Sequence, residues 1–175
     1  MTEEKTPSFM NFDVLNSPFL SDGIQCVPLN AIDAIAFLAL MNHPRIGRHL
    51  PLLTAPFTLE DHQAFLRDKQ QLWDEHQYGP VAFLINGEFA GWGGLQAEQG
   101  DADAALILHP RFWGYGYRIF KHIRHQAFQQ LGLTSITALL PLDRPNHQAI
   151  TRLGFKKNGT LTVHGNVFQR FRLSR

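Results

Sequence analysis

The sequence predicts one α+β domain in which a mixed sheet carries helices on its faces. Asn86-Gly87 separates two apolar runs, as in an antiparallel hairpin, and the second half of the chain alternates strand and helix. Strand, helix and strand in succession imply a right-handed parallel crossover, so antiparallel and parallel pairs are both expected. The length of 175 residues fits a single domain over residues 1–175.

Composition indicates a globular protein. Apolar residues make up 44% of the chain and 14 residues are Phe, which excludes intrinsic disorder. A formal net charge of +1 provides no general field toward nucleic acid or an anionic membrane, so neither is expected as a partner. The most apolar stretch, Ala31–Met41, is far shorter than the roughly 20 residues of a membrane span. The single cysteine, Cys26, fits a reducing compartment, and a cytoplasmic location is expected.

Local patterns predict the elements of the first half. Asn30 is the expected N-cap of the first helix, and Thr58 with Asp61 resembles a capping box that opens the second. Glu88, beside the hairpin turn, is interpreted as a turn residue, and residues 1–20 are expected to form a peripheral or flexible N-terminal segment. In order, we expect a strand at Ile24–Leu29, helices at Ala31–Met41 and from Thr58 to about Glu75, and strands at Val81–Ile85 and Phe89–Leu95.

The second half shows the strand and helix alternation. Gly132 and Gly154 follow apolar stretches of helical period and are expected to end two helices. Arg170 and Arg172 lie in the last expected strand and are interpreted as charges that protect a sheet edge. We expect strands at Ala104–Leu108, Ser135–Leu140, Lys156–Thr160 and Asn166–Leu173, with helices at Gly116–Leu131 and Asn146–Leu153.

The stretch from Leu106 to Arg118 carries the most chemical information. A buried strand runs into a segment with Gly114 and Gly116, and a helix follows directly. Backbone N–H groups and a helix N-terminus then point at one spot, and glycines let an anion approach closely. Arg111 adds a guanidinium that fits a phosphate, so a pyrophosphate site is predicted. No Gly-Lys-Ser/Thr triplet of a Walker loop follows, and Ile119 stands where a Rossmann fingerprint needs a small residue.

This stretch and its surroundings resemble the GCN5-related N-acetyltransferase (GNAT) family. Arg111–Gly116 resembles the loop that wraps the pyrophosphate of acetyl-coenzyme A (acetyl-CoA). Phe89–Leu95 resembles the third strand of the branch that acetylates protein N-termini and ribosomal proteins, and Leu153-Gly-Phe155 resembles the end of the last helix. The resemblance keeps its order over roughly residues 22–173. It implies a mostly antiparallel mixed sheet of six to seven strands, splayed between the fourth and fifth, with about four flanking helices.

The resemblance also implies acetyl-CoA as co-substrate, lying between the splayed strands, and no metal. At each of two places the sequence allows two alignments with the family. The small residue of the family's loop falls on Gly116 or Arg118, with Gly116 preferred. The Asn of the family falls on Asp143 or Asn146. The residues expected to hold the co-substrate are Ile107, Leu108, His109, Arg111, Phe112, Trp113, Gly114, Tyr115, Gly116, Tyr117 and Asn146.

The implied reaction is direct acetyl transfer to a primary amine, on a protein N-terminus or a small molecule. Backbone N–H near Leu108 would stabilise the oxyanion, and a general base must deprotonate the ammonium. Asp103 is one candidate base, since related enzymes often carry Glu near this strand start. The alternative interpretation of Asp103 is a solvated acid in a turn. His109, at the strand exit, is the other candidate, against a structural histidine bonded to backbone.

The proton donor for the departing thiolate is a departure from the family pattern. Ile150 stands where the family often has Tyr, so Tyr115, Tyr117 or water would serve, or no acid is needed. A non-catalytic acyl-CoA binding module is therefore the second hypothesis, and a plain protein-interaction domain is the third. A monomer and a homodimer are both compatible with the sequence.

Overall fold

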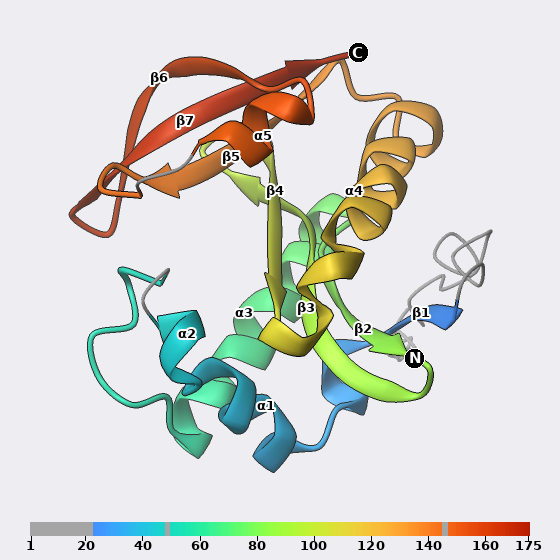
Figure 1. Cartoon of the computed structure of the whole chain (residues 1–175), viewed down its shortest axis with the longest axis vertical. Coiled ribbons are helices and arrows are strands. Elements are labelled where there is room, and N and C mark those ends of the chain that lie inside the picture. The colour runs from blue at the N-terminus through green and yellow to red at the C-terminus, as the bar shows by residue number, and fades with distance from the viewer. Residues whose placement is uncertain (1–22, 48–49, 145–146) are drawn as a thin grey trace, which may run out of the picture.

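The computed structural model describes residues 23–47, 50–144 and 147–175, which form a seven-stranded mixed sheet with helices packed on it (Figure 1). The strand order is β1-β2-β3-β4-β5-β7-β6, and β4–β5 is the parallel pair among otherwise antiparallel neighbours. The predicted α+β class and mixed sheet are confirmed. The strands are β1 (Ile24–Val27), β2 (Pro80–Ile85), β3 (Glu88–Glu98), β4 (Asp101–Leu108), β5 (Ser135–Pro141), β6 (Lys156–Val163) and β7 (Asn166–Ser174).

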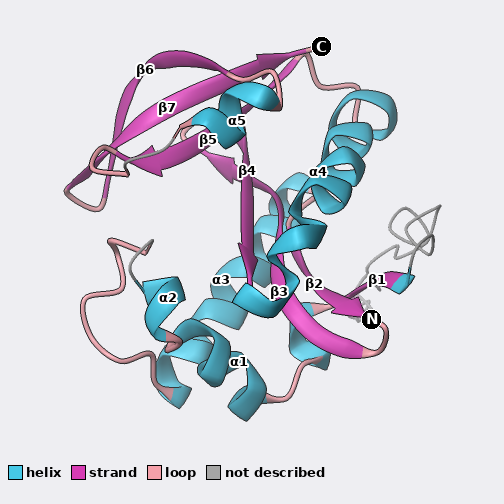
Figure 2. Cartoon of the chain, in the orientation of Figure 1, coloured by secondary structure: helices cyan, strands magenta, loops and turns pink. Residues whose placement is uncertain are grey.

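Among the described residues, three α-helices precede β2 in the chain and two follow β4. Figure 2 shows the helices in cyan. No helix in the described ranges has the length and apolar character of a membrane span. The α-helices are α1 (Ala34–Met41), α2 (Pro44–Gly47), α3 (Leu59–His76), α4 (Gly116–His125) and α5 (Gln148–Arg152). Shorter helical turns are the 3-10 segments η3 (Leu29–Ala31) and η4 (Pro110–Tyr115), and the π-helical turn η5 (Gln126–Gln130).

Two core clusters lie against the sheet. One joins β-strand side chains to Ile119, Phe120 and Ile123 of α4. The other joins Phe37 of α1 to Trp92 of β3, with side chains of α3 packed against it. Because side chains alternate along a strand, β3 and β4 each contribute to both clusters. The cluster with α1 and α3 defines the face on which the acidic side chains described below lie.

The helix starts follow local capping chemistry, with one correction. The Thr58–Asp61 capping box is confirmed: the Asp61 amide donates to Thr58 Oγ1 at 3.2 Å, and the Thr58 amide donates to the Asp61 carboxylate at 2.9 Å. Asn30 was the wrong N-cap for the first helix. It lies inside η3, and Asp33 caps α1 by accepting the Ile35 amide at 3.3 Å.

The helix expected at Gly116–Leu131 is present but changes geometry near its end. After α4 the chain forms the π-helical turn η5, in which the Leu131 amide donates to the Gln126 carbonyl at 2.9 Å. Gly132 then adopts a φ of +65°, the left-handed conformation that ends a helix most readily at glycine. The predicted stop is confirmed.

The glycines of β3 allow its backbone to lie very close to β4. A Cβ built on Gly93 would overlap the Ala105 carbonyl oxygen, and one on Gly91 would overlap the Ile107 carbonyl oxygen. These neighbours are backbone atoms, which cannot turn aside as a flexible side chain can. The glycines are therefore required by strand packing.

The two parts of the sheet are joined by an ion pair as well as by strand pairing. Arg172 of β7 holds the Asp101 carboxylate of β4 through two hydrogen bonds, at 2.8 and 3.1 Å, and Arg170 lies 3.6 Å from the same carboxylate. The prediction that Arg170 and Arg172 protect a sheet edge was wrong. In the observed order β7 lies between β5 and β6, and the arginines reach across β5 to the start of β4.

We expect Gly93→Ala to destabilise the fold by about 2–4 kcal/mol, because the new methyl group would force β3 away from β4. Gly47→Ala is the matched control, since a Cβ at Gly47 meets open space. Urea unfolding of the two variants measures the difference. Equal stability of both would contradict the close approach of the strands.

We expect Asp101→Asn to cost about 1 kcal/mol at pH 7 and clearly less at pH 3. Arg172 holds the pKa of Asp101 below its usual value of 3.8. The stabilisation is therefore complete above that value and lost as the pH falls through the lower pKa of the folded state. Urea unfolding at both pH values is the measurement, with the exposed Asp143→Asn as control; an equal cost at pH 3 would rule out the ion pair as its cause.

Candidate active site between β4 and β5

The open edge of β4 is the central feature of the site. β4 pairs with β3 along its whole length, from Asp101 to Leu108, but its pairing with β5 is restricted to Asp103 and Thr137. Beyond that point the strands separate, and Figure 1 shows β5 turning away from the line of β4. The predicted splay is confirmed. An unpaired strand edge offers backbone donors and acceptors to an extended ligand.

The end of β4 is partly engaged by its own chain. The His109 amide donates to the Ala90 carbonyl at 2.8 Å, and the indole N–H of Trp113 donates to the Leu108 carbonyl at 2.8 Å. Leu108 is buried toward α4, whereas the half-buried Ile107 packs on the α1 and α3 side. Two backbone groups of residues expected to hold the co-substrate, the His109 amide and the Leu108 carbonyl, thus already have partners.

The segment predicted as a glycine loop is helical. Pro110–Tyr115 forms the 3-10 helix η4, which runs directly into α4. Pro110 suits the first helical position, and the His109 ring caps the turn. The Gly116 amide donates to the Trp113 carbonyl, so it is not an open amide at the start of α4. The side chain of Tyr115, the N-cap residue of α4, makes no capping hydrogen bond to the first turn of the helix.

The two glycines of this segment are not required by the chain itself. Neither Gly114 nor Gly116 has a positive φ, and Gly116 is in ordinary helical conformation at φ −55° and ψ −43°. A Cβ at Gly114 would meet open space, and one at Gly116 would touch Leu106 and Leu108 at 3.9–4.0 Å. Gly114 therefore leaves open space beside η4, which fits the close approach of a phosphate group, whereas the Cβ position of Gly116 faces the β4 side chains.

Arg111 and Phe112 differ from their expected roles. Arg111 is exposed and forms an ion pair with Glu88, and its guanidinium lies 5.0 Å from the Phe112 ring centre. Glu88 is thus more than the turn residue that the sequence suggested. The Phe112 side chain is 9% exposed and belongs to the core, so its backbone is the part available to a ligand.

Three aromatic residues predicted to contact the co-substrate lie in η4 and the first turn of α4. Trp113 is 43% exposed, and the Arg45 guanidinium of α2 lies over its ring at 4.4 Å. Tyr115 is half-buried against Phe112, with ring centres 6.3 Å apart, and Tyr117 is 63% exposed. The exposed rings of Trp113 and Tyr117 can contact a ligand without repacking of the core.

His109 belongs to a pair of matching tripeptides. His43-Pro-Arg45 and His109-Pro-Arg111 each place the histidine Nδ1 so that it accepts the arginine amide, both at 3.2 Å. The two histidine rings meet edge to face, 5.0 Å between centres. Burial, with His43 and Arg111 nearby, lowers the pKa of His109, so its ring is neutral near pH 7. The contact ties α2 to the end of β4.

Asp103 lies at the point where β4 meets β5. It is 5% exposed and accepts a hydrogen bond from Thr137 Oγ1 at 3.1 Å. The interpretation of Asp103 as a solvated turn acid is therefore wrong. Burial raises its pKa to about 7, against hydrogen bonds from Thr137 and Gln96 that favour the ionised form.

The partners of Asp103 were missed in the sequence. Thr137 follows from the parallel β4–β5 register, which the strand pattern alone does not fix. Gln96 of β3 lies opposite Asp103, and the ammonium of Lys69 on α3 donates to the side-chain amide oxygen of Gln96, Oε1, at 2.8 Å. Thr137 is a polar residue within an apolar stretch, whereas Lys69 lies among other polar residues and had no such signal.

The helix α5 region is described in part. Asn146 lies outside the described residues, so its predicted contact with the co-substrate is not placed. Asp143 is exposed, and Ile150 is half-buried against the core cluster of α4.

Comparisons with known proteins agree with this geometry. A family model for the acetyltransferase (GNAT) domain matches residues 26–156. An acetyltransferase from Agrobacterium tumefaciens superposes with a TM-score of 0.69 at 18% identity, covering 87% of this chain and 91% of that one. The microcin C7 self-immunity acetyltransferase MccE, solved with acetyl-CoA and AMP, gives 0.67 at 15% identity over 88% and 93%. RimL, a ribosomal L7/L12 alpha-N-protein acetyltransferase solved with coenzyme A, gives 0.65 at 15% identity over 86% and 92%.

These neighbours share the fold at low identity, and RimL is one of several, so the resemblance to its branch is not singled out. The search of curated protein sequences gives no match. The family model spans most of the chain, including the splayed strands and the η4 segment. The chain belongs to the GNAT family of acetyltransferases.

Proposed function

We propose that this protein is an N-acetyltransferase that moves an acetyl group from acetyl-CoA to a primary amine, with Asp103 as general base. The observation that carries the proposal is the position of Asp103. It is a buried carboxyl group with a pKa of about 7, located where the splayed strands meet. A general base is most effective when its pKa lies near the working pH.

The groups that would hold the co-substrate come from β4, η4 and α4. The open edge of β4 beyond Asp103 suits the amides of the pantetheine arm. The open space beside Gly114, in the turn that leads into α4, suits the pyrophosphate. Arg111 can exchange Glu88 for a phosphate oxygen, because both residues of the pair are exposed.

The proposed chemistry needs one proton acceptor from this chain. Acetyl-CoA supplies a thioester, whose carbonyl carbon gains a bond to nitrogen while its bond to sulfur breaks. The Asp103 carboxylate takes one proton from the substrate ammonium, directly or through a water, which leaves the nitrogen lone pair free to attack. A second proton leaves the nitrogen as the amide forms, and the departing thiolate takes up one proton.

His109 is the weaker candidate base in this geometry. Its Nδ1 lone pair accepts the Arg111 amide, so the neutral ring carries its proton on Nε2 and presents a donor. A donor at the end of β4 can hydrogen-bond the substrate but cannot accept its proton. This contrast supports Asp103 as the base, with His109 and Tyr115 as groups that orient ligands.

A protein N-terminus and a small-molecule amine both remain acceptors in this proposal. The glycines that suggested the N-terminal branch, Gly91 and Gly93, are accounted for by strand packing against β4. They therefore carry no information about the acceptor.

A non-catalytic acyl-CoA binding module is the second candidate. Ile150, a hydrocarbon where the family often has a proton donor, favours it. Thiol release with a panel of amines at saturating acetyl-CoA distinguishes the two: release supports the enzyme, and its absence with every amine supports the binding module. Thermal shift tests binding itself, since a ligand at 100 times its Kd adds about 2.7 kcal/mol.

We expect Gly116→Val to weaken acetyl-CoA binding about tenfold or more, because the side chain occupies the room left for a phosphate. The helical φ and ψ of Gly116 accept other residues, so the variant should remain folded. Calorimetry gives the affinity, with Gly116→Ala as a milder step and Gly47→Val as control. Unchanged affinity in a folded variant would sink the assignment of this site.

We expect kcat/KM of the wild type to rise with pH through about 7 and then level, because Asp103 must lose its proton to act as base. Asp103→Asn should remove this limb and lower the rate by about 10²–10⁴-fold. Thiol release measured from pH 5 to 9 tests both. A variant with the wild-type rate and the same limb would show that another group is the base.

A further inference from the structure

A row of polar side chains crosses the central strands on the α1 and α3 face. Gln96 of β3 is the register partner of Asp103, and Asp103 is the register partner of Thr137 on β5. Paired residues on neighbouring strands project to the same side of a sheet, here the side of Trp92 and Ile107. Asp103 therefore has a hydrogen-bonding neighbour on each adjacent strand.

Lys69 of α3 completes this row from above the sheet. Its Nζ donates to Gln96 Oε1 at 2.8 Å and lies 5.4 and 5.9 Å from the ring centres of Phe65 and Trp92. Burial lowers the pKa of Lys69, opposed by the charges of Glu98, Asp68 and Asp103. The ammonium is thus half-buried between aromatic rings and acidic groups.

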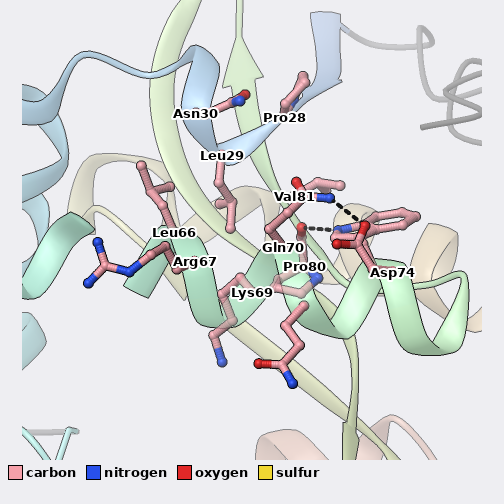
Figure 3. Close-up of a pocket in the computed structure, with 12 residues that line it drawn as sticks. Pro28, Leu29, Asn30, Leu66, Arg67, Lys69, Gln70, Asp74, Pro80 and Val81 are labelled. Atoms are coloured by element: carbon pink, nitrogen blue, oxygen red, sulfur yellow. Dashed lines mark hydrogen bonds between the residues drawn. The ribbon is translucent and has the colours of Figure 1, made fainter. Parts of the chain in front are cut away.

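This position is not imposed on Lys69 by lack of space. Its side chain also borders a cavity of about 350 Å³ between α3 and the segment Pro28–Asn30 (Figure 3). Apolar residues that include Leu29, Leu66 and Val81 line much of that cavity. A mainly apolar lining solvates an ammonium poorly, which favours its extension to Gln96 instead.

The side-chain amide of Gln96 can relay the polarising effect of the Lys69 ammonium toward Asp103. Because Oε1 accepts from Lys69, the amide nitrogen is the group left to donate toward Asp103, the register partner of Gln96, and Gln96 lowers the pKa of that carboxyl. A cation at one end polarises the amide and strengthens its donation to a carboxylate at the other. Thr137 adds a second donor to the same carboxyl.

We propose that Lys69, acting through Gln96, is a positioning residue that keeps the Asp103 carboxylate ionised and oriented as the proton acceptor of the reaction. The inference rests on the proposed function of Asp103 and adds to it the groups that control that carboxylate. It gives a role to the hydrogen bond by which Lys69 of α3 reaches Gln96 on the central strand β3.

The other charges around Asp103 act in the opposite sense or are already neutralised. Glu98 of β3 and Asp101 of β4 both disfavour a second carboxylate nearby. Asp101 is itself held by Arg172 and Arg170 of β7. The charge of Asp68 on α3 acts on Lys69, and β5 contributes the uncharged Thr137. Lys69 therefore offsets the acidic neighbours from the α3 side.

The decisive measurement follows the ¹³Cγ signal of Asp103 by NMR during a pH titration, which requires no turnover. Lys69→Met removes the charge and should raise the Asp103 midpoint by about one pH unit. Gln96→Leu should raise it similarly, and the double variant should add little to the larger single effect, since both act through one path. Lys69→Arg, which keeps the charge and a donor, should restore most of the wild-type midpoint.

Lys157→Met is the matched control, because it removes one charge from an exposed position on β6 and should leave the midpoint unchanged. Backbone amide spectra check that each variant is folded, and Lys69→Gln replaces Lys69→Met if the latter is not. An unmoved midpoint in the folded Lys69 and Gln96 variants would overturn the proposal.

Kinetics separates this proposal from the function on which it rests. In Lys69→Met the rising limb of kcat/KM should move to higher pH by the same amount as the NMR midpoint, with the plateau rate reached above it. If Asp103→Asn keeps the wild-type limb, the base assignment fails, and with it the catalytic role of Lys69. If Asp103→Asn loses the limb while Lys69→Met leaves it in place, the base stands and the role of Lys69 fails.

Discussion

The structure depends on one restricted strand pairing, in which β4 meets β5 at Asp103 and Thr137 and then leaves it. A parallel pair that continued would close the sheet and leave no backbone for an extended ligand. A pair that was absent would leave two separate half-sheets. The hydrogen bond between the two side chains and the ion pair of Arg172 with Asp101 hold the strands together at this point. The open edge and the buried acid have the same cause.

Two aspartates on the same face of β4 show how neighbours decide the state of a carboxyl group. Asp101 contacts Arg172 directly, and its pKa is lowered. Asp103 lies two residues further along and is more deeply buried, and this burial raises its pKa although the amide of Gln96 and the hydroxyl of Thr137 favour the ionised form. One carboxylate is fixed as a structural ion, whereas the other can exchange a proton near neutral pH.

Glycine has two different roles within one short region. Gly93 is required because β3 and β4 lie too close for a side chain. Gly116 has helical geometry and room for a methyl group beside Leu106 and Leu108, so the chain itself does not require a glycine there. Distinguishing the two needed coordinates, because Gly-x-Gly in a sequence does not reveal which atoms lie opposite it.

The sequence by itself determined the local elements: the Asn86-Gly87 hairpin, the Thr58–Asp61 capping box and the position of the glycine-bearing segment. These depend on contacts within a few residues, so their signal is local. Even there the cap was misplaced: Asn30 and Asp33 are both good N-cap residues, and the 3-10 turn η3, which contains Asn30, decided the choice. The resemblance of the Arg111–Gly116 segment gave the family and the splay.

Only the tertiary structure decided that β7 is internal, that Arg172 reaches Asp101, and that Lys69 and Gln96 join Asp103. Arg172 and Asp101 are 71 residues apart, and Lys69 and Gln96 are 27 apart. Such pairs depend on strand order and helix placement, which the whole core selects by burying its apolar faces together. A local pattern specifies which face of a strand is apolar, but not which distant side chain will cover a polar residue on it.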